Sequence, residues 1–322
     1  MATENGKLLT VTGTGGVAHS RRRALAWGLG AWNWLPGALA GAGAGTPVRL
    51  AISESLVADV NLNDARAAMQ IWVKRIAQDM KVVVEFNPKV FDTSEEILRR
   101  TRSGQLDTVA LNIVEYRHVA NLLDASQIVA ESFTQGPEQY VILVKRDSGI
   151  QKLGDLRGRR LILLKNPKMC VASAWLSTLL DEGHHGETEQ FFGSVTTETK
   201  PSRVVLPVFF GQTDGCLTSK RGYDTMCALN PQVGKDLRAL ATSAPMVVSF
   251  YVFRKNFQDA IREKFLTAIA NVRSTPAGRQ LAMLFQFDEL KVQDSSCLAS
   301  ALSVLDAADR ARGRRGAASR KE

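Results

Sequence analysis

Polar side chains stand where two of the predicted strands end, and their types suit ligand binding. Ser53 and Glu54 follow one short apolar run, and Asn112 and Tyr116 follow another. Because ligands of open α/β sheets bind at the carboxyl ends of the strands, these side chains would hydrogen-bond to a small solute or stack on it. The alternative is that each one packs or caps a loop, and the sequence leaves both interpretations open.

A turn between a predicted strand and a predicted helix supplies a second candidate site. It contains Asn166, Lys168, Met169 and Cys170, and a helix is predicted over 171–180. Backbone N–H groups at the start of a helix attract anions, and Lys168 adds a positive charge. We therefore expect this turn to bind a small anion, mostly through its main chain.

Two further charged residues are candidates for ligand contact. Lys200 precedes Pro201 at another predicted helix start, and Asp214 precedes Gly215 beside a strand. Lys200 would add a cation, whereas Asp214 would accept a hydrogen bond from a ligand amine. A solvated lysine and an acid that orients a neighbouring loop are the alternative interpretations.

No catalytic motif accompanies these residues. The sequence has no glycine-rich phosphate loop, no GxSxG, no HExxH and no readable carboxylate pair. An enzyme that used a Cys170 thiolate or Asp214 would need a base beside it, and none is evident. We expect binding without a reaction, and we expect no cofactor.

The cysteines do not predict a metal site. Cys170, Cys216, Cys227 and Cys297 are scattered and form no CxxC pair, which argues against zinc. Cys216 and Cys227 are the best candidates for a disulfide in an oxidising compartment. Four buried free thiols are the other possibility.

Strands and helices alternate along most of the chain, which predicts parallel strands with helices on both faces of the sheet. Strands are predicted at 48–52, 82–86, 107–111, 138–145, 160–164, 212–217, 238–240 and 247–253. Helices are predicted at 63–80, 94–103, 171–180, from Pro201 onward, and at 257–272, 276–285 and 295–308. The fold class is therefore α/β.

Two long apolar runs divide the chain into two lobes. We predict that the chain crosses between the lobes near 140–146 and again near 247–253. Residues 47–143 and 250–309 would form lobe 1, and 144–249 would form lobe 2. A ligand cleft would then lie between the lobes, with the two crossings as its hinge. Residues 310–322 have no apolar side chain larger than alanine, so we expect a disordered basic tail.

The charge is concentrated at the ends of the chain. The 322 residues carry a formal net charge of +9, of which +3 lies in residues 1–40 and +5 in residues 310–322. A body of about +1 lacks the clustered cations of a nucleic-acid interface. We therefore expect no nucleic-acid partner.

The N-terminal residues are typical of an export signal. Ser20, Arg21 and Arg22 open an apolar stretch over 24–40, and small residues follow with several A-x-A cleavage sites. The pattern resembles a twin-arginine signal, which would be cleaved near residues 40–45 and would place the mature chain in the periplasm. A membrane anchor or a first helix is the alternative. We expect contact with a membrane only through a partner.

Four short motifs together resemble one protein family. They are LGDLRG at 153–158, SGQLDTVA at 103–110, GQTDG at 211–215 and STPAG at 274–278. By their order and spacing along the chain, these motifs are similar to those of the phosphate/phosphite/phosphonate-binding proteins of ABC importers, over about residues 47–290. The resemblance implies the two-lobed type 2 periplasmic binding-protein fold, a small anionic solute and a membrane permease as partner.

The sequence departs from this family where the family holds its oxyanion. The family's hydroxyl-rich turn reads Lys168-Met169-Cys170-Val171-Ala172 here, and its Ser-His pair falls near Thr199 and Lys200. An anion would therefore rely on backbone N–H groups and on Lys168. A periplasmic sensor for a receptor kinase has the same fold and is the rival hypothesis to a transport protein.

Overall fold

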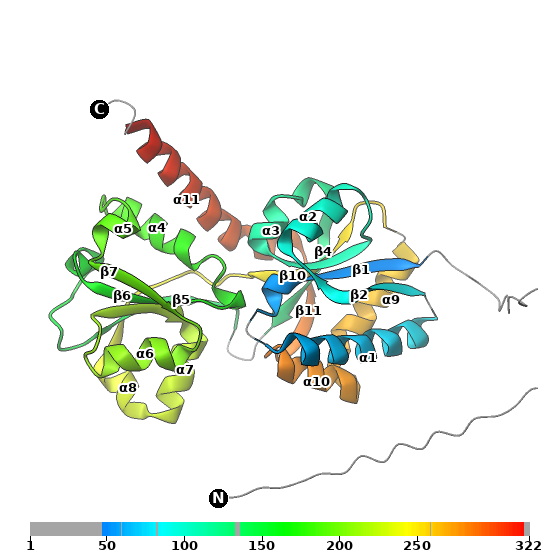
Figure 1. Ribbon diagram of the computed structural model, residues 1–322, viewed down its shortest axis with the longest axis horizontal. Helices are drawn as coiled ribbons and strands as arrows, with labels where there is room; N and C mark the ends of the chain where they lie inside the picture. The colour runs from blue at the N-terminus through cyan, green and yellow to red at the C-terminus, as the bar shows by residue number, and fades with distance from the viewer. Residues whose placement is uncertain (1–46, 59, 82, 133–135, 258, 319–322) are drawn as a thin grey trace, which may run out of the picture. The chain divides into compact units, whose positions relative to one another are not determined.

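The computed structural model describes residues 47–58, 60–81, 83–132, 136–257 and 259–318. The expected export signal and its cleavage site lie outside these residues. No helix among the described residues is long and apolar enough to cross a membrane. The fold is mixed α/β with two separate sheets (Figure 1). We call the part built on the six-stranded sheet lobe 1 and the part built on the five-stranded sheet lobe 2.

Lobe 1 has the strand order β11-β4-β10-β3-β1-β2. Its strands are β1 (Val48–Ser53), β2 (Val84–Asp92), β3 (Thr108–Asn112), β4 (Leu123–Ser132), β10 (Ser249–Arg254) and β11 (Glu289–Gln293). β1 lies parallel to both β2 and β3, whereas β10 runs antiparallel to β3 and β4. The carboxyl ends of β2, β1 and β3 therefore meet at one edge of the sheet.

Helices cover both faces of this sheet because its parallel strands are apolar on both sides. Leu50 and Ile52 pack into one core and Ala51 into the other, as the two-residue period of a strand requires. The lobe 1 helices are α1 (Leu62–Met80), α2 (Ser94–Arg102), α3 (Ile113–Arg117), α9 (Asp259–Ala270) and α10 (Pro276–Leu284). Short 3-10 turns include η1 (Glu54–Leu56), η2 (Ala120–Leu122) and η5 (Val272–Ser274).

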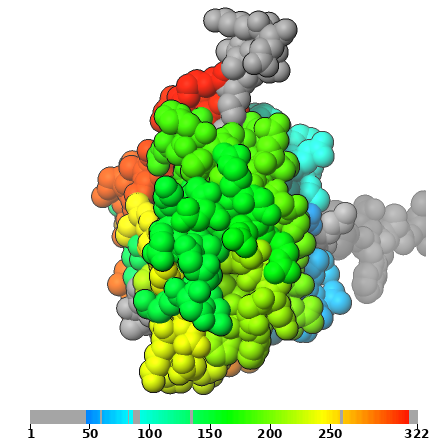
Figure 2. All heavy atoms as spheres, turned by 90° about the vertical axis from the view of Figure 1, so that its left-hand side faces the viewer, coloured from blue at the N-terminus to red at the C-terminus, as the bar shows by residue number. Residues whose placement is uncertain are grey.

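Lobe 2 has the strand order β7-β6-β8-β5-β9, with β6 parallel to β7 and β8. Its strands are β5 (Tyr140–Lys145), β6 (Arg160–Leu164), β7 (Ser194–Glu198), β8 (Gly215–Ser219) and β9 (Leu237–Thr242). Its helices are α4 (Ala172–Glu182), α5 (Thr188–Phe191), α6 (Pro201–Phe209), α7 (Lys220–Leu229) and α8 (Pro231–Asp236), with 3-10 turns η3 (Leu153–Leu156) and η4 (Pro167–Met169). Residues of this lobe, coloured green to yellow, fill most of the face seen in Figure 2.

The chain passes between the lobes at places other than those predicted. The run 140–145 is the strand β5, which pairs with β8 and β9 inside the lobe 2 sheet, and the run near 247–253 contains β10 of lobe 1. Both runs are apolar because they are buried strands and not connectors. The connecting segments are 136–139 and 243–248, and Glu138 and Met246 join them through two backbone hydrogen bonds of 3.2 and 2.8 Å.

The last helix corrects the prediction of a disordered tail from residue 310. After η6 (Ser295–Leu298), α11 runs over Ala299–Ala318 and packs against α3 of lobe 1 and α4 of lobe 2. Ala311 is fully buried, and ion pairs join Arg117 to Asp309 and Arg314 to Asp181. Alanine is the best helix former and fits a close helix contact, so this segment needs no large apolar side chain to be ordered. Figure 2 shows the red end of this helix beside the green residues of lobe 2.

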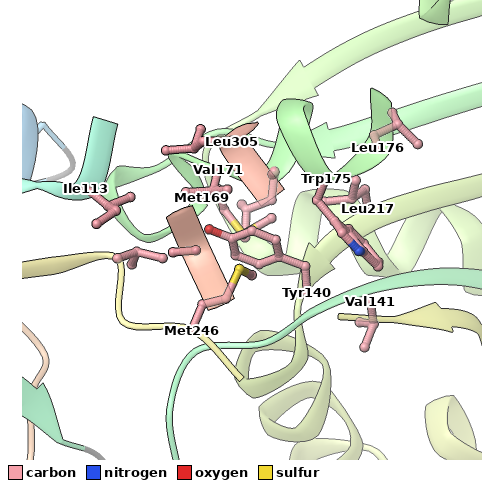
Figure 3. Close-up of a cluster of buried hydrophobic side chains, with 14 of the residues drawn as sticks. Ile113, Tyr140, Val141, Met169, Val171, Trp175, Leu176, Leu217, Met246 and Leu305 are labelled. Carbon is pink, nitrogen blue, oxygen red and sulfur yellow. The ribbon is translucent and has the colours of Figure 1, made fainter. Parts of the chain in front are cut away.

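One hydrophobic core continues from lobe 1 into lobe 2. Its members include Ile113 of lobe 1, Tyr140 and Trp175 of lobe 2, Met246 of a connecting segment and Leu305 of α11. Figure 3 shows these side chains gathered around the Tyr140 ring. The connecting segments and α11 therefore share buried apolar surface with both sheets.

Candidate functional site

The polar residues of lobe 1 meet at the carboxyl ends of three adjacent parallel strands. Ser53 ends β1, Asn112 ends β3 and Ser94 begins the helix after β2. This edge is where ligands bind in open α/β sheets. The arrangement brings together Ser53 and Asn112, both predicted from the sequence, with residues that the sequence did not single out.

A single carboxylate lies at the centre of this edge. Oε1 of Glu115 accepts hydrogen bonds from the hydroxyls of Ser53 at 2.6 Å, Ser55 at 3.0 Å and Ser94, and Oε2 accepts one from the backbone N–H of Asn112 at 3.0 Å. We call these five residues the Glu115 nest. Glu115 is only 5 % exposed, so these four donors replace the water molecules that would hydrate its carboxylate in solution.

The local sequence explains the position of Glu115. Asn112 caps α3, its Oδ1 accepts the Glu115 N–H at 2.9 Å, and the Glu115 side chain returns to the Asn112 N–H as a capping box. The Asn112 amide also donates to the Ser55 hydroxyl at 3.0 Å, which holds η1 over the nest. The start of α3 carries a partial positive charge that further stabilises the carboxylate.

The predicted anion turn of lobe 2 is largely satisfied by its own atoms. Asn166 caps η4, and its side chain accepts the Lys168 N–H at 3.1 Å. Its backbone carbonyl accepts the Met169 N–H at 3.0 Å, and the Tyr140 hydroxyl donates to the Lys168 carbonyl at 2.8 Å. Met169 is buried in the shared core. The following helix, α4, begins without a side-chain cap. No capping side chain therefore accepts a hydrogen bond from the backbone N–H groups of its first turn.

Contacts across the two lobes place this turn beside the edge of lobe 1. The Lys168 ammonium group pairs with the carboxylate of Glu131 on β4, and both side chains are about four-fifths buried. The Cys170 thiol lies 3.8 Å from the carbonyl of Val248, to which it donates. The turn of lobe 2 and the carboxyl edge of lobe 1 are therefore neighbours, and we treat them as one candidate site.

The same region holds a second buried acid, Glu138, in a connecting segment. It is 4 % exposed and pairs with Arg221 at 2.8 Å, while its other oxygen has no hydrogen-bond partner among the described residues. Burial raises the pKa of Glu138 to about 7 against the opposing effect of Arg221. Burial also raises the pKa of the Cys170 thiol to about 12, and the nearby Glu115 charge adds to this. The raised pKa favours the neutral thiol form of Cys170 over the thiolate.

Tyr116 and Glu54 lie outside the Glu115 nest. Tyr116 packs edge-on against Phe250 with ring centroids 5.1 Å apart, inside the shared core. Glu54 is exposed on η1, whereas its neighbours Ser53 and Ser55 turn into the nest. The alternation of side chains along the chain at the end of β1 explains why only one member of the pair Ser53-Glu54 points inward.

Asp214 also lies away from the nest and the turn, whereas Lys200 lies at the same carboxyl edge of the lobe 2 sheet as the turn. Asp214 precedes β8, so it stands at the opposite end of that strand from the carboxyl edge, and it accepts hydrogen bonds from the Arg160 N–H at 2.9 Å and the Arg160 guanidinium at 3.2 Å. It orients a loop, as the alternative interpretation proposed. Lys200 is exposed at the start of α6, after the edge strand β7.

Four residues of this site were not predicted from the sequence: Ser55, Ser94, Glu115 and Glu131. One signal was available, because an asparagine followed three residues later by glutamate is the pattern of a capping box. Nothing in the sequence indicates that the same glutamate collects three serine hydroxyls from two other segments. That gathering follows from the parallel order β2-β1-β3.

An apolar cavity of about 110 Å³ lies beside this edge, within lobe 1. Its lining includes Leu56 of η1, Trp72 of α1, Phe285, and the polar residues Glu131 and Ser249. The cavity places apolar surface next to the Glu131–Lys168 pair. No group of three or more potential metal-ligating side chains occurs in the described ranges, and all four cysteines are free thiols there.

Two sheets joined by two connecting segments, with facing polar edges, define a two-lobed solute-binding protein. The chain matches the family described as "ABC transporter, phosphonate, periplasmic substrate-binding protein" over residues 56–296. The chain belongs to this family of periplasmic substrate-binding proteins, which function with the permease of an ABC transporter. No curated protein sequence matches the chain significantly.

Solved structures show the same fold at low sequence identity. XAC2383 from Xanthomonas citri, bound to ATP, is 15 % identical with a TM-score of 0.58, covering 84 % of this chain and 99 % of its own. PhnD1 from Prochlorococcus marinus, in complex with methylphosphonate, is 12 % identical with a TM-score of 0.53, covering 82 % and 97 %. A binding protein component of an ABC phosphonate transporter from Pseudomonas aeruginosa is 13 % identical with a TM-score of 0.50, covering 86 % and 99 %. These likenesses confirm the predicted type 2 periplasmic binding-protein fold.

Proposed function

We propose that this chain is the exported solute-binding protein of an ABC-type importer and that it holds a small anionic solute between its two lobes. The observation that carries the proposal is the meeting of the two sheet edges, where Lys168 of lobe 2 pairs with Glu131 of lobe 1. A solute at this place contacts both lobes. It therefore stabilises one arrangement of the lobes, which the membrane permease recognises.

Lys168 and the start of α4 are the groups that would bind the anion. Lys168 is the cation that reaches the lobe boundary in this turn, and the uncapped first turn of α4 offers backbone N–H groups beside it. An anion that takes the place of Glu131 keeps the Lys168 charge compensated. Binding thus replaces the Lys168–Glu131 ion pair by contacts of both lobes with the solute, and no chemical reaction takes place.

A thermal-unfolding screen of the full-length chain tests this function. The compounds are phosphate, phosphite, methylphosphonate, sulfate, small carboxylates and amino acids. A solute that binds only the folded state stabilises it by about 2.7 kcal/mol at one hundred times its dissociation constant. We expect at least one anion to raise the unfolding midpoint of the wild type and to lose this effect in Lys168→Ala.

Lys165→Ala is the matched control, because Lys165 is exposed just before the same turn. An anion effect that both variants lose equally would point to general electrostatics and would contradict the proposed role of Lys168. Uptake of the bound solute by cells that lack the protein then separates transport from sensing. Ligand binding without any loss of uptake would favour a sensor for a receptor kinase.

A further inference from the structure

The Glu115 carboxylate occupies the place on lobe 1 where a ligand of this kind of sheet would sit. The hydroxyls of Ser53 at the end of β1, Ser55 in η1 and Ser94 at the start of α2 converge on its two oxygens together with the backbone N–H of Asn112, the residue that caps α3. Ser53 is fully buried, and Asn112 is 8 % exposed. The acceptor at the centre of these four donors is therefore a side chain of the protein itself, the Glu115 carboxylate.

The donors of the nest are those that an oxyanion would need. A serine hydroxyl has one proton to donate, and the hydroxyls of Ser53, Ser55 and Ser94 all lie within hydrogen-bond distance of Oε1 of Glu115. The Ser53 and Ser55 hydroxyls also lie 2.9 Å apart, so their protons are shared between each other and Oε1. Ser55 also accepts from the Asn112 amide at 3.0 Å, and Ser53 accepts from the Ser55 N–H at 3.3 Å. No hydroxyl proton of the nest is left for a second anion.

Charge excludes a second anion from the nest as well. A phosphonate or carboxylate beside Glu115 would place two negative charges within a few ångströms in a poorly hydrated site, where their repulsion is large. The Glu131 carboxylate lies near the same edge and is matched by Lys168. Positive charge at this place is therefore supplied from lobe 2.

We propose that Glu115 is a built-in anion that fills the oxyanion place of lobe 1 and thereby sets the specificity of the site. The negative group of the solute binds at Lys168 and the start of α4, and the part of the solute that faces lobe 1 carries no negative charge. The claim about the charge of the solute rests on the proposed function. The claim that Glu115 fills the oxyanion place concerns the nest alone and is tested without the natural solute.

The test removes the carboxylate and offers a free anion in its place. Full-length wild type, Glu115→Ala, Glu115→Gln and Glu95→Ala are unfolded thermally in increasing acetate, phosphite or methylphosphonate, with sodium chloride at matched ionic strength as the salt control. Glu95 is the matched control acid, because it is exposed next to Ser94 in the first turn of α2.

We expect Glu115→Ala to unfold at a lower temperature than wild type and to recover with acetate or phosphite in a saturable manner. Wild type and Glu95→Ala should respond alike to each anion, so that any gain from an anion bound at Lys168 is common to both, and only Glu115→Ala should show an additional saturable gain. Glu115→Gln should show no additional gain, because its amide still fills the space. A folded Glu115→Ala that shows no additional saturable gain from any of the three anions would overturn the proposal.

A second measurement applies even if Glu115→Ala does not fold. Methylphosphonate binding is compared between wild type and Ser94→Ala, in which one nest hydroxyl is absent. Binding that is unaffected by Ser94→Ala, or no binding in either protein, agrees with a nest closed by Glu115. Wild-type binding that Ser94→Ala abolishes would show that the hydroxyls serve the solute and would overturn the proposal. A wild type that binds no solute at all contradicts the proposed function and leaves the rescue of Glu115→Ala as a separate result.

Discussion

The Lys168 ammonium group pairs with the Glu131 carboxylate, and this pair joins the turn before α4 to the end of β4 in the other lobe. The two side chains are 20 % and 21 % exposed, so the pair is shielded from water without being fully buried. Under the proposed function, this pair links the affinity for the anion to the contact between the lobes.

Releasing Lys168 from Glu131 should strengthen anion binding. In Glu131→Gln the ammonium group no longer has to leave a carboxylate, so we expect tighter binding of the anion found in the screen and a loss of about 1 kcal/mol of unfolding free energy. Isothermal titration calorimetry and urea denaturation measure the two effects. Glu289→Gln on exposed β11 is the control, and an anion affinity that falls in Glu131→Gln would contradict the link.

Glu138 should make stability depend on pH near neutrality. Its pKa is about 7 in the folded chain against an ordinary 4.5, so the folded state holds a proton that the unfolded state releases over this range. The unfolding free energy should therefore fall as pH rises from about 4.5 to 7, by up to about 3 kcal/mol, and level off above 7. Urea denaturation at several pH values measures this. Glu138→Gln should flatten the slope, and an unchanged slope would contradict the assignment.

Asp107 should give the opposite dependence at acid pH. Burial raises the pKa of Asp107, but hydrogen bonds from Arg49 and Arg254 outweigh burial and lower it to about 2. The charged form is favoured in the folded chain, so its contribution is complete above about pH 4 and is lost as pH falls toward 2. We expect Asp107→Asn to cost about 2 kcal/mol at pH 7 and to reduce the acid sensitivity. An equal acid loss in both proteins would contradict this.

The four cysteines should react as free but protected thiols. Burial raises the pKa of Cys170 to about 12, and Cys216 is fully buried in β8 with its pKa also raised. We expect slow reaction of the native chain with a thiol reagent and four reactive thiols after denaturation without reductant. Two reactive thiols after denaturation would instead indicate a disulfide, for which Cys216 and Cys227 were the candidates.

Local patterns were sufficient to predict most elements of the fold. The run Arg160–Leu164 is β6 with the predicted bounds, and the predicted helix over 63–80 is α1 with one more residue. The strands β4, β7 and β11 were missed because they mix polar residues into their sequences. The strand β7 (Ser194–Glu198), for example, has the sequence Ser-Val-Thr-Thr-Glu and is half-exposed at the edge of its sheet. Edge strands are defined by pairing with a neighbour, which no local pattern encodes.

The candidate site was only half predictable for a related reason. Ser53, Asn112 and the Asn166–Cys170 turn were predicted because each follows a recognisable strand. Glu115 was not, because its role depends on hydroxyls that come from segments 21 and about 60 residues away. The crossings were misplaced because an apolar connector and a buried strand have the same composition.

The helix α11 has a consequence for how the protein is made. Residues 299–318 are translated long after α4, which is formed from residues 172–182, yet they cover part of it. That face of lobe 2 therefore stays uncovered while more than a hundred residues are still being added. Its burial awaits α11, so a ribosome that stops before residue 299 releases a lobe with exposed apolar surface. The covering of α4 is therefore a late step in the synthesis and folding of lobe 2.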